Sequence, residues 1–87
     1  MPLNIRHDEQ HQQFTALLDQ AEIGELAYAL PDSETIDFQH TFIEKEHRGQ
    51  GHANTLIKFG LDYASEQGLQ VKATCRAVAS YLERYPQ

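Results

Sequence analysis

The sequence predicts a small α+β fold built on a mixed sheet, in which an antiparallel meander precedes a parallel strand–helix–strand unit and a short final helix. Apolar and polar residues alternate through the first half, as far as Ile43, which is typical of strands with one buried face. From Gly51 the apolar spacing changes to that of a helix, and a strand-like run follows it. A crossover of this kind places its two strands parallel within one sheet.

Three or four strands are expected before the helix. The strand-like runs cover residues 3–8, Gln13–Gln20, Ala21–Leu30 and Thr35–Ile43. Turn-forming residues, Pro31-Asp32-Ser33, separate the last two runs. The last run alternates most cleanly, and it predicts two faces. One predicted face consists of Ile36, Phe38, His40 and Phe42, and the other of Asp37, Gln39, Thr41 and Ile43.

The second half is expected to contain two helices with a strand between them. Small or apolar residues recur at helical spacing after Gly51, and Gly68 is a suitable end for that helix. The run Leu69–Cys75 has the usual length of a strand. A short helix is expected over Val78–Tyr85, because Pro86 cannot continue it.

The composition narrows the class of protein. With 87 residues the chain is expected to form a single domain over 1–87. The net charge of −6 argues against a nucleic-acid binder, and no apolar run is long enough to span a membrane. The lone cysteine and the polar N-terminal segment, which lacks a signal-peptide pattern, favour a cytoplasmic protein. No metal site is expected, and the protein should be a monomer or a small homo-oligomer.

A glycine-rich turn, HRGQGHA, joins the last meander strand to the helix. Gly49 and Gly51 leave room for an anion to approach the main chain, and the first amides of a helix lack intrahelical partners. Arg48 adds a guanidinium that suits phosphate. The turn is not a Walker loop, because His52-Ala53 follows the second glycine, and it fits a dinucleotide-binding fingerprint poorly. A turn that only reverses the chain is the alternative.

The pattern Arg48, Gly51, Ala53 resembles the pyrophosphate-binding loop of the GNAT acetyltransferase superfamily. The resemblance extends from about Ala27 to Pro86. This part of the chain is similar to a family of very small GNAT-like proteins. The similarity covers HTFIEKEHRGQG, the helix after it and CRAVASYLERYP. Members of that family have a His-Thr pair, an Arg-Gly-Gln-Gly loop and a cysteine before a Tyr-Leu…Pro tail. Two positions depart from that family, which usually has proline at 76 and a basic residue at 80.

The resemblance implies a minimal GNAT-like fold that binds acetyl-CoA as cosubstrate. The pantetheine arm would lie between the strands Thr35–Ile43 and Leu69–Cys75, against the main chain of Thr41, Phe42 and Ile43. The pyrophosphate would lie on the amides of the glycine-rich turn, formed by Arg48, Gly49, Gln50, Gly51, His52 and Ala53. His47 and His52 beside this turn could add positive charge below neutral pH.

Three residues are candidates for catalysis of acetyl transfer to an amine. Cys75 could take the acetyl group first, with His40 as base, or the amine could attack acetyl-CoA directly, with His40 or a water removing its proton. Tyr81 could protonate the leaving thiolate, as a tyrosine on the last helix does in larger GNAT enzymes. Each residue could instead be a packing residue. The sequence leaves the acceptor unidentified, and two alternatives remain: a non-catalytic acyl-CoA-binding or regulatory module, and a small interaction domain without a ligand.

Overall fold

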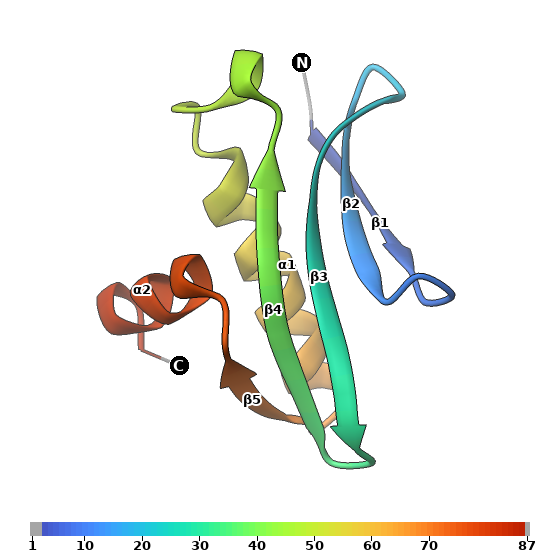
Figure 1. Cartoon of the computed structure of the whole chain (residues 1–87), viewed down its shortest axis with the longest axis vertical. Helices are drawn as coiled ribbons and strands as arrows, with labels where there is room; N and C mark the ends of the chain where they lie inside the picture. The colour runs from blue at the N-terminus through green and yellow to red at the C-terminus, as the bar shows by residue number, and fades with distance from the viewer. Residues whose placement is uncertain (1–2, 87) are drawn as a thin grey trace.

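The computed structural model describes residues 3–86, which form one five-stranded sheet with two helices (Figure 1). The sheet has the order β1-β2-β3-β4-β5, and its neighbouring strands are antiparallel except for the parallel pair β4 and β5. The elements in chain order are β1 (Leu3–Asp8), β2 (Gln13–Leu18), β3 (Ala21–Asp32), β4 (Thr35–Ile43), the 3₁₀ turn η1 (Lys45–His47), α1 (His52–Glu66), β5 (Gln70–Ala73) and α2 (Arg76–Arg84). The predicted α+β fold, with an antiparallel meander and a parallel β-α-β unit, is confirmed, and the meander has four strands.

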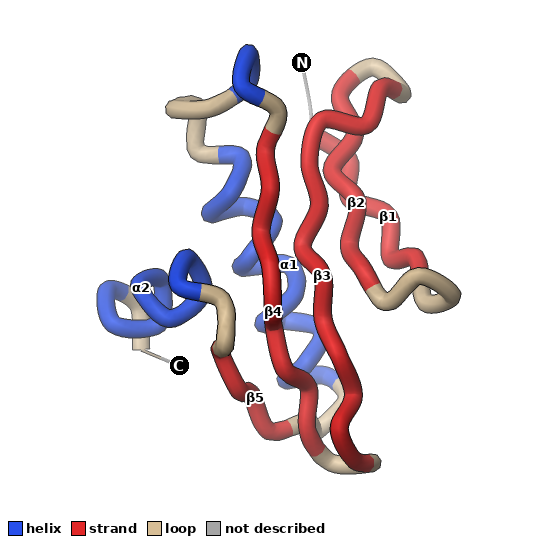
Figure 2. The backbone as a smooth tube through the Cα atoms, in the orientation of Figure 1, coloured by secondary structure: helices blue, strands red, loops and turns tan. Residues whose placement is uncertain are grey.

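Helix α1 lies along one face of the sheet, behind β3 and β4 in Figure 2. Its apolar stripe packs onto alternate residues of the strands, and the fully buried core side chains include Phe14, Leu26, Ile36, Phe38, Leu56 and Val78. Gly60 sets how closely the helix approaches, because a Cβ there would lie 2.8 Å from Leu26 Cδ2 and 2.9 Å from the Phe38 ring. None of the helices in residues 3–86 is long and apolar enough to cross a bilayer.

A β-bulge in β4 makes the predicted division of this strand into two faces wrong. Ala27 of β3 pairs with His40, but the next β3 residue, Tyr28, pairs with Phe38. Gln39 is therefore an extra residue on β4, and an extra residue reverses the alternation beyond it. The even-numbered residues before the bulge face α1, whereas the even-numbered residues after it do not.

The burial of the side chains follows this reversal. Thr41 is paired with Leu26, which packs against α1, so Thr41 and Ile43 face the helix. His40 and Phe42 point to the opposite face, where His40 is exposed and Phe42 is 40% exposed. That face looks toward the viewer in Figure 1, and no helix within residues 3–86 covers it along β3 and β4.

Strand β5 is shorter than the predicted run Leu69–Cys75, since its ladder ends at Ala73. The next residue, Thr74, bonds to the Asp37 side chain instead: its hydroxyl donates at 2.8 Å and its amide at 3.2 Å to Oδ1. Burial alone would raise the pKa of Asp37, but these bonds, with one from Gln39, hold that pKa below its ordinary value. A buried carboxylate thus ends the β4–β5 pairing, and α2 begins two residues earlier than predicted.

Where β1, β2 and β3 meet α1, the core contains a histidine among aromatic rings. His7 stacks on Phe14 with 4.4 Å between ring centroids and meets the Tyr63 ring edge-on at 4.5 Å. Its Nε2 lies 2.6 Å from the Tyr28 hydroxyl. Burial raises the pKa of Tyr28 to about 12, so the phenol is protonated near neutral pH and can donate to a neutral imidazole.

The stability of the fold is expected to decrease when the pH falls below about 6.5, and His7 should cause part of this decrease. Burial lowers the pKa of His7, although Glu9 and Asp8 oppose the shift. The pKa of His7 is lower in the folded chain than in the unfolded chain. The contribution of neutral His7 to stability is therefore fully present above the pKa of the unfolded chain, and it is lost as the pH falls through the pKa of the folded chain. Urea unfolding between pH 8 and 5 measures this slope.

The matched comparison is between His7→Phe and His40→Gln, since His40 is exposed. His7→Phe should flatten the dependence of the unfolding midpoint on pH, even if the loss of the Tyr28 bond makes the variant less stable throughout. A larger flattening in His7→Phe than in His40→Gln assigns the effect to His7. Equal slopes for the wild type and His7→Phe would show that His7 does not titrate with unfolding.

Candidate functional site

One edge of β4 is unpaired over its second half. The last β4–β5 ladder pair is Phe38 with Ala73, followed by one further bond, from the Cys75 amide to the Phe38 carbonyl, at 2.8 Å. Within residues 3–86 no strand pairs with this edge from Gln39 to Ile43, and β5 turns away from it in Figure 1. An unpaired strand edge offers main-chain donors and acceptors to an extended, peptide-like ligand.

The turn after β4 leaves a second row of main-chain donors free. Gly49 and Gly51 have φ of 78° and 82°, the left-handed region that side chains other than glycine rarely adopt. Gly51 is the N-cap of α1 and provides no side-chain cap. In the described part of the chain, the amides from His52 to Asn54 have no hydrogen-bond acceptor, and the first helical bond runs from Thr55 to Gly51. Free amides at a helix start form an anion site.

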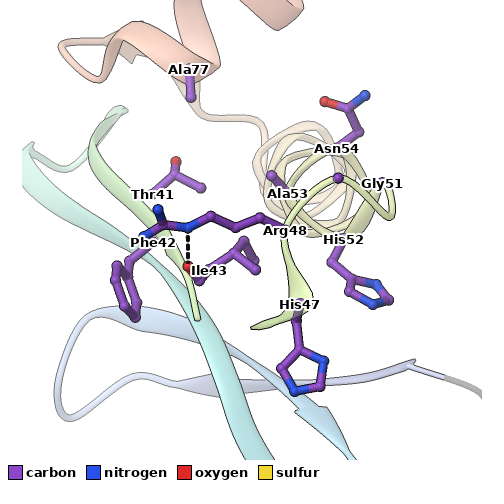
Figure 3. Close-up of a pocket in the computed structure, with 11 residues that line it drawn as sticks. Thr41, Phe42, Ile43, His47, Arg48, Gly51, His52, Ala53, Asn54 and Ala77 are labelled. Carbon is purple, nitrogen blue, oxygen red and sulfur yellow. Dashed lines mark hydrogen bonds between the residues drawn. The ribbon is translucent and has the colours of Figure 1, made fainter. Parts of the chain in front are cut away.

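The two features meet in one cavity of about 350 Å³, which lies between the end of β4 and the start of α1 (Figure 3). A cavity of this size is within the usual range for small-molecule sites. It is lined by Thr41, Phe42, Ile43, His47, Arg48, Gly49, Gly51, His52, Ala53, Asn54 and Ala77. None of these residues is acidic, although the whole chain has a net charge of −6. The cavity is therefore suited to an anion.

Arg48 crosses the cavity and contacts the strand. Its Nε donates to the Ile43 carbonyl at 2.8 Å, and its guanidinium carbon lies 5.7 Å from the centre of the Phe42 ring (Figure 3). The side chain thus joins the turn to the free end of β4, and it lines the cavity. The sequence predicted Arg48 as a phosphate ligand, but the bond to Ile43 was not foreseeable from spacing.

Of the predicted cofactor residues, only Gln50 does not line the cavity; its Oε1 lies 3.2 Å from His52 Nε2. The lining also includes His47, Asn54 and Ala77. Asn54 is not among the predicted cofactor residues, and its position in the first turn of α1 is the signal that identifies it. Ala77 belongs to α2, whose docking depends on tertiary packing.

The structure does not bring the proposed catalytic residues together. Cys75 is 9% exposed at the N-cap of α2, and its Sγ lies 3.3 Å from the Thr41 hydroxyl. His40, the neighbour of Thr41, points to the other face of β4 because of the bulge. Tyr81 is half-buried and lines a smaller neighbouring hollow rather than the main cavity. Thr41, rather than His40, is therefore the neighbour of the thiol.

Comparison with known proteins gives consistent matches. The chain is 31% identical over 86 residues to protein NATD1 of Gallus gallus, covering 98% of this chain and 78% of that protein. The solution structure of a GCN5-like putative N-acetyltransferase from Staphylococcus aureus is 28% identical, with a TM-score of 0.72, and the match covers 94% of this chain and 79% of that one.

Larger acetyltransferases share the fold. The crystal structure of a GNAT family acetyltransferase from Elizabethkingia anophelis with acetyl-CoA bound is 18% identical, with a TM-score of 0.67 and coverage of 88% of this chain. The chain spans about half the length of that enzyme, 54%. A family model described as GCN5-related N-acetyl-transferase matches residues 13–87. The chain therefore belongs to the GCN5-related N-acetyltransferase family.

Proposed function

We propose that this protein binds acetyl-CoA between β4 and the start of α1 and transfers the acetyl group to an amine. The proposal rests on two free rows of main-chain donors, at the edge of β4 and at the start of α1, which line one cavity. No acidic side chain among the described residues lines this cavity. The acetyl-CoA bound to the structurally similar E. anophelis enzyme supports the same cofactor.

The pantetheine arm of the cofactor suits the free edge of β4, and its diphosphate suits the free amides at the start of α1. Pantetheine contains two amide groups, which can pair with the main chain of Thr41 to Ile43 as another strand would. The diphosphate can accept bonds from the amides of Gly49 to Asn54, where the α1 dipole favours negative charge. The terminal nitrogens of Arg48 can reach the same anion while its Nε holds the Ile43 carbonyl.

The acceptor would approach from the face of β4 that no helix covers. His40 is exposed there and has no hydrogen-bond partner among the described residues, so it can take a proton from an attacking amine. Glu25 is half-buried on the same face, opposite Phe42 on the neighbouring strand, and it also has no ion-pair partner within residues 3–86. A carboxylate in this position favours a cationic acceptor.

Direct attack on the thioester suits this geometry better than transfer through Cys75. In the direct route the ammonium acceptor first gives one proton to water. The neutral amine nitrogen then bonds to the acetyl carbon, the carbon–sulfur bond breaks, and a second amine proton passes to His40. CoA leaves as a thiolate, which takes a proton from water to become the free thiol. In the other route Cys75 must first become a thiolate, but its neighbour is the neutral Thr41 hydroxyl and its side chain is buried. The function therefore rests on His40 rather than on a cysteine–histidine pair.

A titration followed by thermal unfolding and calorimetry tests the proposed binding. Acetyl-CoA and CoA at 100 times their Kd should raise Tm by roughly 10–20 °C, because such saturation stabilises a chain of this size by about 2.7 kcal/mol. ATP, which lacks the pantetheine arm, should raise Tm much less at the same concentration. Equal shifts with all three ligands, or no shift, would contradict the proposal.

A second candidate function is a non-catalytic acyl-CoA-binding module. The uncovered face of β3 and β4 favours it, because nothing within residues 3–86 encloses a small acceptor there. The two functions differ in whether amines increase the release of free CoA thiol from acetyl-CoA. Acceleration by polyamines or lysine-containing peptides supports the enzyme, whereas tight binding without acceleration by any amine supports the module.

A further inference from the structure

A second hollow adjoins the cofactor cavity. It has a volume of about 120 Å³ and lies between the first turn of α1 and the exposed side of α2. Its lining is polar and aromatic and consists of Asn54, Ala77, Ser80, Tyr81, Arg84 and Tyr85. Asn54 and Ala77 line both the hollow and the main cavity, so the two spaces are neighbours. A hollow of this size has room for a small polar group.

Among the described residues, Arg84 is the only charged one that lines this hollow. It lies in the last turn of α2, and none of the salt bridges or hydrogen bonds found within residues 3–86 involves its guanidinium. Arginine binds phosphate through several planar N–H donors, and the Ser80 hydroxyl one helical turn earlier adds a donor on the same side. Within residues 3–86 the hollow therefore offers a cation that no carboxylate pairs with, together with a hydroxyl.

We propose that this hollow binds the third phosphate of CoA, the phosphomonoester on the ribose, through Arg84 and Ser80. This inference rests on the proposed function, because the diphosphate on the amides of His52 to Asn54 would place the rest of the nucleotide beside Asn54, at the entrance of the hollow. The diphosphate and pantetheine sites have no means of recognising this group. Arg84 thus makes the protein selective for CoA over 3′-dephospho-CoA.

Calorimetric titration with CoA and with 3′-dephospho-CoA tests the subsite. The wild type should bind CoA roughly 5–10 times more tightly, which is the usual effect of a partly exposed arginine–phosphate contact. Arg84→Gln should lose this preference by weakening CoA binding while leaving the affinity for 3′-dephospho-CoA unchanged. Arg6→Gln is the matched control, since it removes the same charge from β1, where Arg6 pairs with Glu22 at 3.2 Å.

The outcomes separate the subsite from the proposed function. Equal affinity of the wild type for the two ligands overturns the subsite and leaves the proposed function intact. A preference that persists in Arg84→Gln, or that Arg6→Gln removes equally, also overturns the assignment to Arg84. Failure of the wild type to bind either ligand overturns the proposed function itself. Circular dichroism of Arg84→Gln checks that α2 still forms.

Discussion

Replacing Gly51 with valine is expected to weaken acetyl-CoA binding by roughly 100-fold, or about 2.7 kcal/mol. Gly51 holds φ of 82° at the start of α1, where a β-branched residue is strained. Relief of this strain rotates the peptide units that aim the amides of His52 to Asn54 at the diphosphate. The valine side chain also projects into the space where the ligand would lie. Isothermal calorimetry with acetyl-CoA measures the loss.

Gly68→Val provides a matched control at the other end of the same helix. Gly68 has φ of 69°, and a Cβ added there would meet no atom within 4 Å, as at Gly51. Both variants should lose similar stability, on the order of 1–2 kcal/mol, from the strained conformation. Only Gly51→Val should lose acetyl-CoA affinity. Similar affinities of the two variants for acetyl-CoA would show that the glycine-rich turn does not bind this ligand.

Replacing His40 with glutamine is expected to slow acetyl transfer by roughly 100-fold, since general base catalysis typically contributes at least this much. The variant should keep the wild-type Kd for acetyl-CoA, because His40 points away from the cofactor cavity. The rate of CoA thiol release, measured with the most active amine of a panel of polyamines and lysine peptides, gives the effect.

Cys75→Ala distinguishes the two routes of transfer. Direct attack predicts that this variant keeps turnover within about tenfold of the wild type, because the loss of a buried thiol affects packing near Thr41 but removes no reacting group. Intact mass of the wild type after incubation with acetyl-CoA should show no acetylated protein. An acetyl adduct on the wild type that is absent from Cys75→Ala, together with a collapse of turnover in this variant, would contradict direct attack. It would show that the acetyl group passes through Cys75.

Most of the fold was predictable because the period of the apolar residues changes where the architecture changes. The alternating runs up to Ile43 form the meander, and the helical spacing after Gly51 forms α1. The crossover rule then placed β4 and β5 together as parallel neighbours. The glycine pair in the turn likewise indicated the positive φ angles and free amides that the structure contains.

The division of β4 into two faces was not predictable from its alternation. A bulge at Gln39 leaves no mark in a clean pattern, because it depends on the register with β3. This one residue separates His40 from Cys75 and places Thr41 beside the thiol instead. The early end of β5 was missed for a similar reason, since it depends on the tertiary bond between Thr74 and Asp37.

The most direct test of the account is an NMR titration of the ¹⁵N-labelled chain with CoA, which follows each backbone amide separately. The largest shift changes are expected on two segments, Thr41–Ile43 and Gly49–Asn54, all of whose residues except Gln50 line the cavity. The amides of β1 and β2 should remain unchanged. Changes confined to other parts of the sheet, or an unchanged spectrum at saturating CoA, would contradict the claim that these free amides bind the cofactor.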